Sequence, residues 1–594
     1  MTANPRNQAI YLDAGPDHVY AVLHPPAAQA TRDTAVVLCP PFGWDEVCSY
    51  RPRRDWAQLL AQAGYPALRV SLPSTGDSGG SPHDPDRLGA WTAAIDHAAR
   101  WLLENTTARR VAAIGIELGG LVAYRAAACG APVEELVLWG TPARGKALVR
   151  QLRALSKLES ARFFEGLKPP PPPPEGEIQA GGFVLAAETR QALDALDLTA
   201  LHLPAGSPQR ALLLHRDSIP AEADLSAALR RAGTAVSVAE GPGYADMTVH
   251  PQRGQAPLAV IDHVTRWLDE TSAPASPMPE RSLGREASVE LACPHGRVRE
   301  TVVAIEQEFG ELAGVLSEPL GPGAGGLCLV LLNAGAIRRM GPNRMWVELA
   351  RRWAARGVPS LRVDMEGLGD SDGDAAPYIE DAGFYTKDRM PQVLAAIDFL
   401  HQRGAGCRFV VGGLCAGGYW SFHATLQDPR VSAALLVNAS RVVWDAALAP
   451  ARDFRRLLTQ RPSWSKLRRA YAEGRVHQMG RWALDTPRRG ASRLRARSTN
   501  PAIMRDALLE QFEASEKRAL LLFSEAEAFE GELARAGWIQ RLGASPNVTV
   551  ERIKVRDHTL RPSWAQAEAH AALDRALERE LTLSVGRNLD ELAA

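Results

Sequence analysis

The chain has 594 residues and a formal net charge of zero, from 68 basic and 68 acidic side chains. This length exceeds what one hydrophobic core usually serves, which favours two domains. The neutral balance gives no overall field that would attract nucleic acid or a membrane surface, and no apolar run approaches the length of about 18 residues that a membrane span needs.

The cysteine content indicates a reducing compartment. Seven cysteines are scattered along the chain without a CxxC pair, which disfavours both a disulfide framework and a structural zinc site. The N-terminal residues show no basic segment leading into an apolar stretch, as a signal peptide would. We therefore expect a cytoplasmic protein with no metal site and no cofactor.

Several segments of the first half recur in the second half. The stretch Gly64–Val70 recurs in similar form at Gly357–Val363, and Gly76-Asp77-Ser78 recurs at the same offset as Gly369-Asp370-Ser371. Later matches have larger offsets, as loop insertions within a shared scaffold would produce. The sequence therefore predicts that one fold occurs twice.

Short apolar runs alternate with amphipathic segments in each half, which is typical of a mostly parallel sheet flanked by helices. In the first half the predicted strands are 35–38, 67–70, 111–114, 136–138 and 211–214. In the second half a predicted β-meander, 297–305 and 311–318, precedes strands 327–332, 360–363, 409–411, 433–436 and 519–522. The expected fold class is α/β, with two such domains in tandem.

A segment rich in proline, serine and alanine, 271–285, is the predicted linker. It divides the chain into a first domain, 1–270, and a second domain, 286–594. The second domain carries an arginine-rich insertion at 439–517, which we expect to form a helical cap. Its charge suits either a solvated helical surface or a cap that meets an anionic substrate.

A candidate nucleophile lies in Gly413-Leu414-Cys415-Ala416-Gly417, between a predicted strand and a predicted helix. Small residues beside Cys415 suit a strained strand–turn–helix corner that neighbouring backbone approaches closely. The pattern resembles the nucleophile elbow of the α/β-hydrolase family, with cysteine in place of the commoner serine. This resemblance implies the hydrolase fold, with Cys415 as the nucleophile.

The same resemblance implies an acid after a later strand and then a histidine, in that chain order. The turn after strand 520–523 brings Glu527 to the acid position, with Glu525 and Glu530 as rivals, and His558 follows a predicted strand at 548–555. An imidazole beside a thiol favours the thiolate, and a carboxylate fixes the imidazole tautomer.

An oxyanion hole is the remaining requirement of this chemistry. We expect it to use the amide of Ala416 and an amide of the loop after strand 327–332, from Gly335 or Ala336. The sequence does not decide which residue of that loop donates.

The corresponding positions of the first half hold Glu117, Ile219 and Met247. Its oxyanion loop contains Pro40 and Pro41, which have no amide hydrogen to donate. The first domain is therefore predicted to be a degenerate hydrolase.

Two alternatives give the first domain chemistry of its own. Glu117 would be a carboxylate nucleophile, as in the epoxide hydrolases, or a migrated triad would use Asp217 and His250. Met247 cannot act as the base that the first alternative needs.

Longer stretches resemble the paired hydrolases associated with exosortase A systems, over most of both halves. In the second half these are 333–335, 339–344, 362–364, 367–371, 413–415 and 557–562. In the first half they are 40–42, 182–185 and 196–198. The resemblance implies the hydrolase fold for each half and says little about the substrate.

The residues favour a Cys-dependent enzyme that hydrolyses an ester or thioester through an acyl-cysteine intermediate. The alternatives are an acyltransferase or cyclase that passes the acyl group to an amine or alcohol, a dienelactone-hydrolase-like ring opening, and a non-catalytic scaffold or binding protein. The expected partner is a small-molecule or carrier-bound acyl substrate, with coenzyme A or a carrier protein as the carrier. Nucleic acid and a membrane span are not expected.

Overall fold

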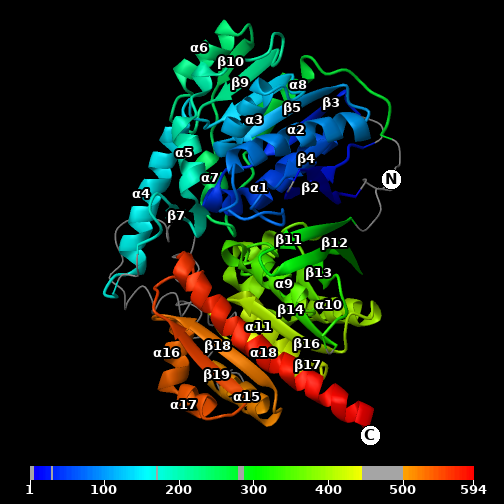
Figure 1. Cartoon of the computed structure of the whole chain (residues 1–594), viewed down its shortest axis with the longest axis vertical. Helices are drawn as coiled ribbons and strands as arrows, with labels where there is room; N and C mark the ends of the chain where they lie inside the picture. Colours follow the sequence, from blue (N-terminus) through cyan, green and yellow to red (C-terminus); the bar gives the residue numbers. More distant parts are fainter. Residues whose placement is uncertain are drawn as a thin grey trace, which may run out of the picture.

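The computed structural model describes residues 6–15, 17–27, 31–168, 172–278, 287–324, 326–443 and 500–593. It contains two large sheets, each flanked by helices, one above the other in Figure 1. The central part of the predicted arginine-rich cap, residues 444–499, lies outside the described residues.

The first sheet has eight strands in the order β1-β2-β4-β3-β5-β6-β9-β10. They are β1 (Gln8–Ala14), β2 (Asp17–His24), β3 (Thr34–Cys39), β4 (Ala67–Val70), β5 (Arg110–Ile116), β6 (Glu135–Trp139), β9 (Arg210–Leu214) and β10 (Ala235–Ala239). Strand β2 is antiparallel to both of its neighbours, and the other pairs are parallel.

The second sheet has nine strands in the order β11-β12-β13-β15-β14-β16-β17-β18-β19. They are β11 (Ser288–Cys293), β12 (Gly296–Gln307), β13 (Gly310–Pro319), β14 (Leu327–Leu331), β15 (Ser360–Val363), β16 (Arg408–Leu414), β17 (Val431–Val437), β18 (Arg518–Ser524) and β19 (Val548–Ile553). After the additional strand β11, this order repeats the first sheet strand for strand. The predicted strands and the predicted α/β fold class are confirmed.

Helices cover both sheets. Around the first sheet they are α1 (Gly43–Gln62), α2 (Arg87–Asn105), α3 (Leu118–Ala128), α4 (Gly145–Phe163), α5 (Ala187–Ala195), α6 (Ala223–Arg231), α7 (Tyr244–Thr248) and α8 (Leu258–Asp269). Around the second they are α9 (Met345–Ala355), α10 (Met390–Gln402), α11 (Ala416–Gln427), α15 (Pro501–Ala514), α16 (Ala528–Arg535), α17 (Trp538–Gly543) and α18 (Ser563–Ala593). A small hairpin, β7 (Ile178–Ala180) and β8 (Phe183–Leu185), lies outside both sheets.

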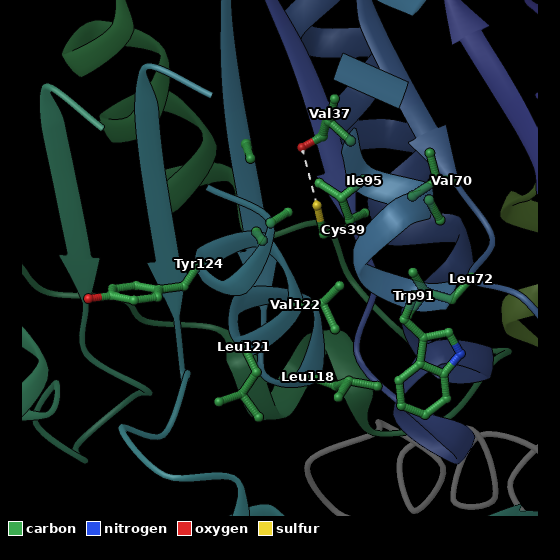
Figure 2. Packing of buried hydrophobic residues seen from close by; sticks show 14 of the residues in the cluster. Val37, Cys39, Val70, Leu72, Trp91, Ile95, Leu118, Leu121, Val122 and Tyr124 are labelled. Atoms are coloured by element: carbon green, nitrogen blue, oxygen red, sulfur yellow. Dashed lines mark hydrogen bonds between the residues drawn. The ribbon is translucent and has the colours of Figure 1, made fainter. Parts of the chain in front are cut away.

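The central strands are mostly apolar because helices cover both faces of each sheet. Every residue of β3 is buried. Figure 2 shows Leu118, Leu121 and Val122 of α3 in the same buried cluster as Trp91 and Val37, so α3 and α2 close one face of the first sheet.

Helix α4 belongs to the first half but reaches the core of the second. It extends downward from the upper body in Figure 1, and Phe163 at its end lies in the second core with Leu560. The amide of Arg556 donates to the Phe163 carbonyl at 3.1 Å, and Arg561 pairs with Glu159 at 3.0 Å. The two halves therefore share part of one apolar core.

A layer of buried charged side chains also joins the halves. Arg69 of the first half pairs with Asp370 of the second at 2.7 Å, and Asp77 of the first half pairs with Arg362 of the second at 3.1 Å. Arg69 and Arg362 are equivalent in the sequence repeat, and so are Asp77 and Asp370. Exchanging the halves exchanges the two ion pairs, which is the pattern of an isologous interface.

Glu300 lies at the centre of this layer and is fully buried. It accepts hydrogen bonds from Arg351 and Arg362, each at 2.7 Å, and from Ser317 at 2.8 Å. Burial alone would raise the pKa of Glu300, but Arg351 and Arg362 lower it to about 2. Arg351 also donates to the Asp77 carbonyl at 2.9 Å, which ties Glu300 to the first half.

The start of the predicted linker is attached to the first half. The Ala273 amide donates to Asp33 at 2.9 Å, Ser272 and Thr34 bond through their hydroxyls at 3.0 Å, and Pro274 forms a β-bridge with Arg32. Residues 279–286 lie outside the described part of the chain.

The variant Glu300→Gln should lower the free energy of unfolding by about 3 kcal/mol at pH 7, because a neutral amide leaves two buried guanidinium groups without their carboxylate. Chemical denaturation measures the loss, and the control is Glu290→Gln, whose carboxylate pairs with arginines at the surface.

The pH dependence of this difference has a definite sign. The folded-state pKa of Glu300 is lowered from 4.5 to about 2, so its contribution is present above pH 4.5 and is lost as the pH falls toward 2. The difference between wild type and Glu300→Gln should shrink over that interval. An equal difference at pH 7 and at pH 3 would contradict the assignment of this stability to the Glu300 carboxylate.

Candidate active site

Cys415 stands at the corner between β16 and α11, with φ 58° and ψ −110°. A residue with a side chain rarely adopts a positive φ, so the surrounding structure must hold this backbone in place. A Cβ added at Gly417 would lie 2.2 Å from the Asn333 carbonyl oxygen, and one at Gly413 would lie 2.3 Å from Gly417. Only glycine fits at these two positions, as the sequence motif predicts.

His558 and Glu527 meet beside this corner. His558 follows β19, Glu527 follows β18, and their Nδ1 and Oε1 atoms are 2.9 Å apart. Of the two rivals, Glu530 pairs with Arg552, and the Glu525 amide donates to the Val555 carbonyl at 2.9 Å. Glu527 is thus the carboxylate in contact with the imidazole.

The charges of Cys415 and His558 stabilise each other. Burial would raise the pKa of the Cys415 thiol, but the charge of His558 and a hydrogen bond with it lower this pKa to about 7. Burial would lower the pKa of His558, but Cys415 and Glu527 raise it well above its ordinary value. Near neutral pH the arrangement favours a thiolate beside an imidazolium.

Two hydroxyl groups flank the sulfur of Cys415, and neither belongs to a sequence motif. The Tyr385 hydroxyl lies 3.2 Å and the Ser440 hydroxyl 3.4 Å from Sγ. Both contribute to lowering the pKa of the Cys415 thiol. Tyr385 comes from a stretch of short 3-10 helices without a recognisable pattern, so only the folded chain identifies it.

Asn438, at the end of β17, anchors the histidine loop and was also missed by the sequence motifs. Its side-chain amide donates to the His558 carbonyl and to the Ser524 hydroxyl, each at 2.7 Å. The Ser524 hydroxyl in turn donates to the Asp557 carbonyl at 2.8 Å. The one sequence signal that points to Asn438 is its position as a polar residue directly after a buried strand.

The expected oxyanion donors come from the start of α11 and from the loop after β14. Ala416 is the first residue of α11, where backbone amides have no partner within the helix. Among the described hydrogen bonds, none is donated by the amides of Ala416, Gly335 or Ala336. A Cβ added at Gly335 would meet no atom within 4 Å, so open space lies beside this loop.

The first half has the same corner with different chemistry. Glu117 has φ 51° and ψ −109°, and its amide donates to the end of β6 at 3.0 Å, just as the Cys415 amide donates to the end of β17 at 3.0 Å. A Cβ at Gly119 would lie 2.2 Å from the Cys39 carbonyl oxygen. The backbone of an elbow is therefore present around Glu117.

Glu117 lies in a buried cluster with Asp45, Tyr244 and Arg216. Burial and the nearby Asp45 raise the pKa of Glu117 to about 8. The Tyr244 hydroxyl donates to Asp45 at 3.4 Å, and the Arg216 guanidinium lies 4.2 Å from the centre of the Tyr244 ring. Tyr244 and Arg216 follow β10 and β9, as His558 and Glu527 follow β19 and β18 in the second half.

The other two degenerate positions differ from each other in burial. Ile219 is 59% exposed, whereas Met247 is fully buried. Asp217, a member of the alternative migrated triad, accepts backbone hydrogen bonds from residues 243–245, and His250 accepts one from the Gln252 amide. Among the described interactions, Asp217 and His250 make none with each other.

The described residues hold no group of three or more side chains suited to bind a metal ion. The helices in the same part of the chain include none that is long and apolar enough to cross a membrane.

Residues 36–297 match the sequence profile described as the Alpha/beta hydrolase family. The match begins within β3, so it leaves out β1 and β2, and it includes the elbow residue Glu117. None of the curated proteins matches the chain.

Solved structures with a similar fold include the esterase Est1E from Butyrivibrio proteoclasticus, with 16% identity, a TM-score of 0.30, and coverage of 44% of this chain and 98% of its own. The mouse alpha/beta hydrolase domain-containing protein 10 has 15% identity, a TM-score of 0.30, and coverage of 47% and 98%. A dienelactone hydrolase from Anabaena variabilis has 12% identity, a TM-score of 0.30, and coverage of 47% and 96%.

In both sheets an antiparallel strand, β2 or β13, precedes a parallel series, and the strand–turn–helix corner follows the third strand of that series along the chain, which agrees with the profile match. Residues 36–297 therefore match the alpha/beta hydrolase family, and both sheet bodies have the alpha/beta hydrolase fold.

Proposed function

We propose that the second half is a Cys-dependent acyl-transfer enzyme that hydrolyses an ester or thioester. The observation that supports it best is the Cys415 thiol, whose pKa is lowered to about 7 beside an imidazole that Glu527 holds at 2.9 Å. A buried structural cysteine has the opposite property, since burial raises the pKa of Cys328 to about 12.

In the proposed reaction the Cys415 sulfur attacks the acyl carbon and forms a C–S bond. The charge that develops on the carbonyl oxygen is met by the Ala416 amide and an amide from Gly335 or Ala336. Collapse of this intermediate expels the alcohol or thiol, which takes a proton from His558. His558 then removes a proton from water, the hydroxide attacks the acyl carbon, and the C–S bond breaks to release the acid.

We further propose the domain division 1–270 and 286–594, with 271–285 as the connection, arising by duplication of one hydrolase domain. The first domain then keeps the fold and lacks the chemistry. The likeness to the hydrolases of exosortase A systems, a cytoplasmic location and a coenzyme A or carrier-bound acyl donor belong to the same proposal. An acyl-Cys415 intermediate could also pass its acyl group to an amine or alcohol. Analysis of the reaction products identifies whether water, an amine or an alcohol is the acceptor.

Alkylation of Cys415 by iodoacetamide should follow a midpoint near pH 7. His558→Ala should slow the labelling at pH 7 by about tenfold or more, because the imidazolium that favours the thiolate is gone. Peptide mapping at graded pH measures both, with the exposed Cys407 as the internal reference. Labelling of Cys407 ahead of Cys415 in the wild-type chain would refute the nucleophile assignment.

Incubation with a panel of acyl thioesters and esters should add one acyl group to the chain. Intact mass spectrometry detects the adduct, and proteolysis should map it to Cys415. The panel pairs coenzyme A thioesters with N-acetylcysteamine analogues and neutral esters. Cys415→Ala should abolish the adduct and the turnover together, whereas turnover that survives this substitution would exclude the proposed mechanism.

Glu117→Gln should leave turnover within about threefold of wild type, because the first half takes no part in the chemistry. With a pKa of about 8, the Glu117 carboxyl is mostly protonated at pH 7, and a neutral amide of the same shape resembles it. Steady-state kinetics on the full chain measures the effect. A loss of 100-fold with folding intact would show that the first half reacts.

A further inference from the structure

Arg339 connects the first half to the loop beside Cys415. It comes from the second half, is fully buried, and pairs with three carboxylates. Asp364 lies at 2.7 Å and Asp370 at 3.0 Å in the same half, and Asp77 lies at 3.0 Å in the first half. The guanidinium also lies 5.1 Å from the centre of the Tyr20 ring, which belongs to the first half.

Asp364 connects Arg339 to the loop that follows β14. One carboxylate oxygen of Asp364 accepts from the Asn333 side chain at 2.8 Å and from the Arg339 amide at 2.5 Å. Asn333 also donates to the Ile337 carbonyl at 3.0 Å and accepts from the Met365 amide at 2.8 Å. Both ends of the segment 333–339 are therefore fixed to Asp364.

This segment contains Gly335 and Ala336, the candidate oxyanion donors. Ala334 and Ile337 close a tight turn between them, since the Ile337 amide donates to the Ala334 carbonyl at 3.1 Å. Ala336 and Cys415 pack against the same apolar cluster. The position of the two amides relative to the sulfur thus depends on how firmly Asp364 and Arg339 hold the ends of the turn.

We propose that Asp77, in the first half, is a positioning residue for the Cys415 site, and that it acts through Arg339 and Asp364 on the turn 334–337. This inference rests on the proposed function. Asp77 neutralises part of the Arg339 charge on the side away from Asp364. Without that charge, only Asp364 and Asp370 of the second half hold the Arg339 guanidinium. The end of the turn that Arg339 anchors is then held less firmly.

The expected effect is large because oxyanion stabilisation depends steeply on geometry. Loss of one donor costs roughly 100-fold to 1,000-fold in kcat, and a displacement of about 1 Å costs roughly 100-fold. A partial displacement of the turn therefore reduces turnover without changing the thiol, whose pKa is set by His558, Ser440 and Tyr385.

The test compares Asp77→Asn with Asp17→Asn in the full chain. Asp17 is the matched control, because it is also a buried aspartate of the first half, it pairs with Arg87 at 2.6 Å, and it is not among the described ion-pair partners of Arg339. Asp77→Asn should lower kcat by about tenfold or more with KM within about threefold. The rate and the pH midpoint of Cys415 alkylation should stay at the wild-type values, which a general loss of folding would not permit.

Equal kcat values for Asp77→Asn and Asp17→Asn, with both chains folded, would overturn the positioning role and leave the proposed function intact. If Asp77→Asn does not fold, Asp77→Glu takes its place, since it keeps the negative charge and displaces the carboxylate from its position beside Arg339. It should give the same division between kcat and alkylation rate, and wild-type kinetics in this variant would likewise overturn the proposal.

Hydrogen exchange separates this proposal from the proposed function. Peptides that cover 333–341 should exchange faster in Asp77→Asn than in wild type, and should be unchanged in Asp17→Asn. Faster exchange in Asp77→Asn would support the link from Asp77 to the loop, whether or not the enzyme turns over an acyl substrate. If none of the acyl substrates is turned over, only the proposed function is refuted. Unchanged exchange in both variants would overturn the link itself.

Discussion

The mutual neutralisation of buried charges between the two sheet bodies is the constraint on which the rest of the structure depends. A charged side chain taken out of water costs several kcal/mol unless partners with good geometry compensate it. Arg339 and Arg362 are both fully buried, and each has carboxylate partners on both sides of the boundary between the halves. Neither half can shift against the other without uncovering such a charge.

This constraint gives the first half a structural part in the molecule. Its strands, its elbow backbone and its close glycine contacts are kept, while Glu117 and Met247 occupy positions that the second half uses for a thiol and an imidazole. The surface of the first half that contacts the second half depends on an intact core and on its buried charged side chains.

The sequence was sufficient to predict the sheets, because hydrophobic periodicity and the internal repeat are local signals that each strand carries by itself. Chain order and turn chemistry also pointed to Cys415, His558 and Glu527 as candidate site residues, and the last two lie 2.9 Å apart in the structure. Tyr385, Ser440 and Asn438 could not be found in this way. Their contacts with the sulfur or the histidine loop arise only when distant segments come together, and none of them lies in a motif.

The charged layer illustrates the same limit. Asp77 and Asp370 appear in the sequence as members of a repeated Gly-Asp-Ser tripeptide, which reads as a turn. Their pairing with arginines of the opposite half follows from how the two sheets dock, and a single sequence carries no direct record of docking. The repeat indicated that Asp77 and Asp370 are equivalent. Only the structure shows that each of them pairs with an arginine of the other half.

The exchanged ion pairs also determine when the molecule can be completed during synthesis. Arg69 leaves the ribosome long before its partner Asp370, which lies 301 residues later in the chain. At ordinary rates of translation this interval lasts roughly 15 to 60 s. Throughout that time the first sheet body presents Arg69 and Asp77 to water as an unfinished charged surface. Closure of the interface is therefore a late event, which takes place only after most of the second sheet body has been made.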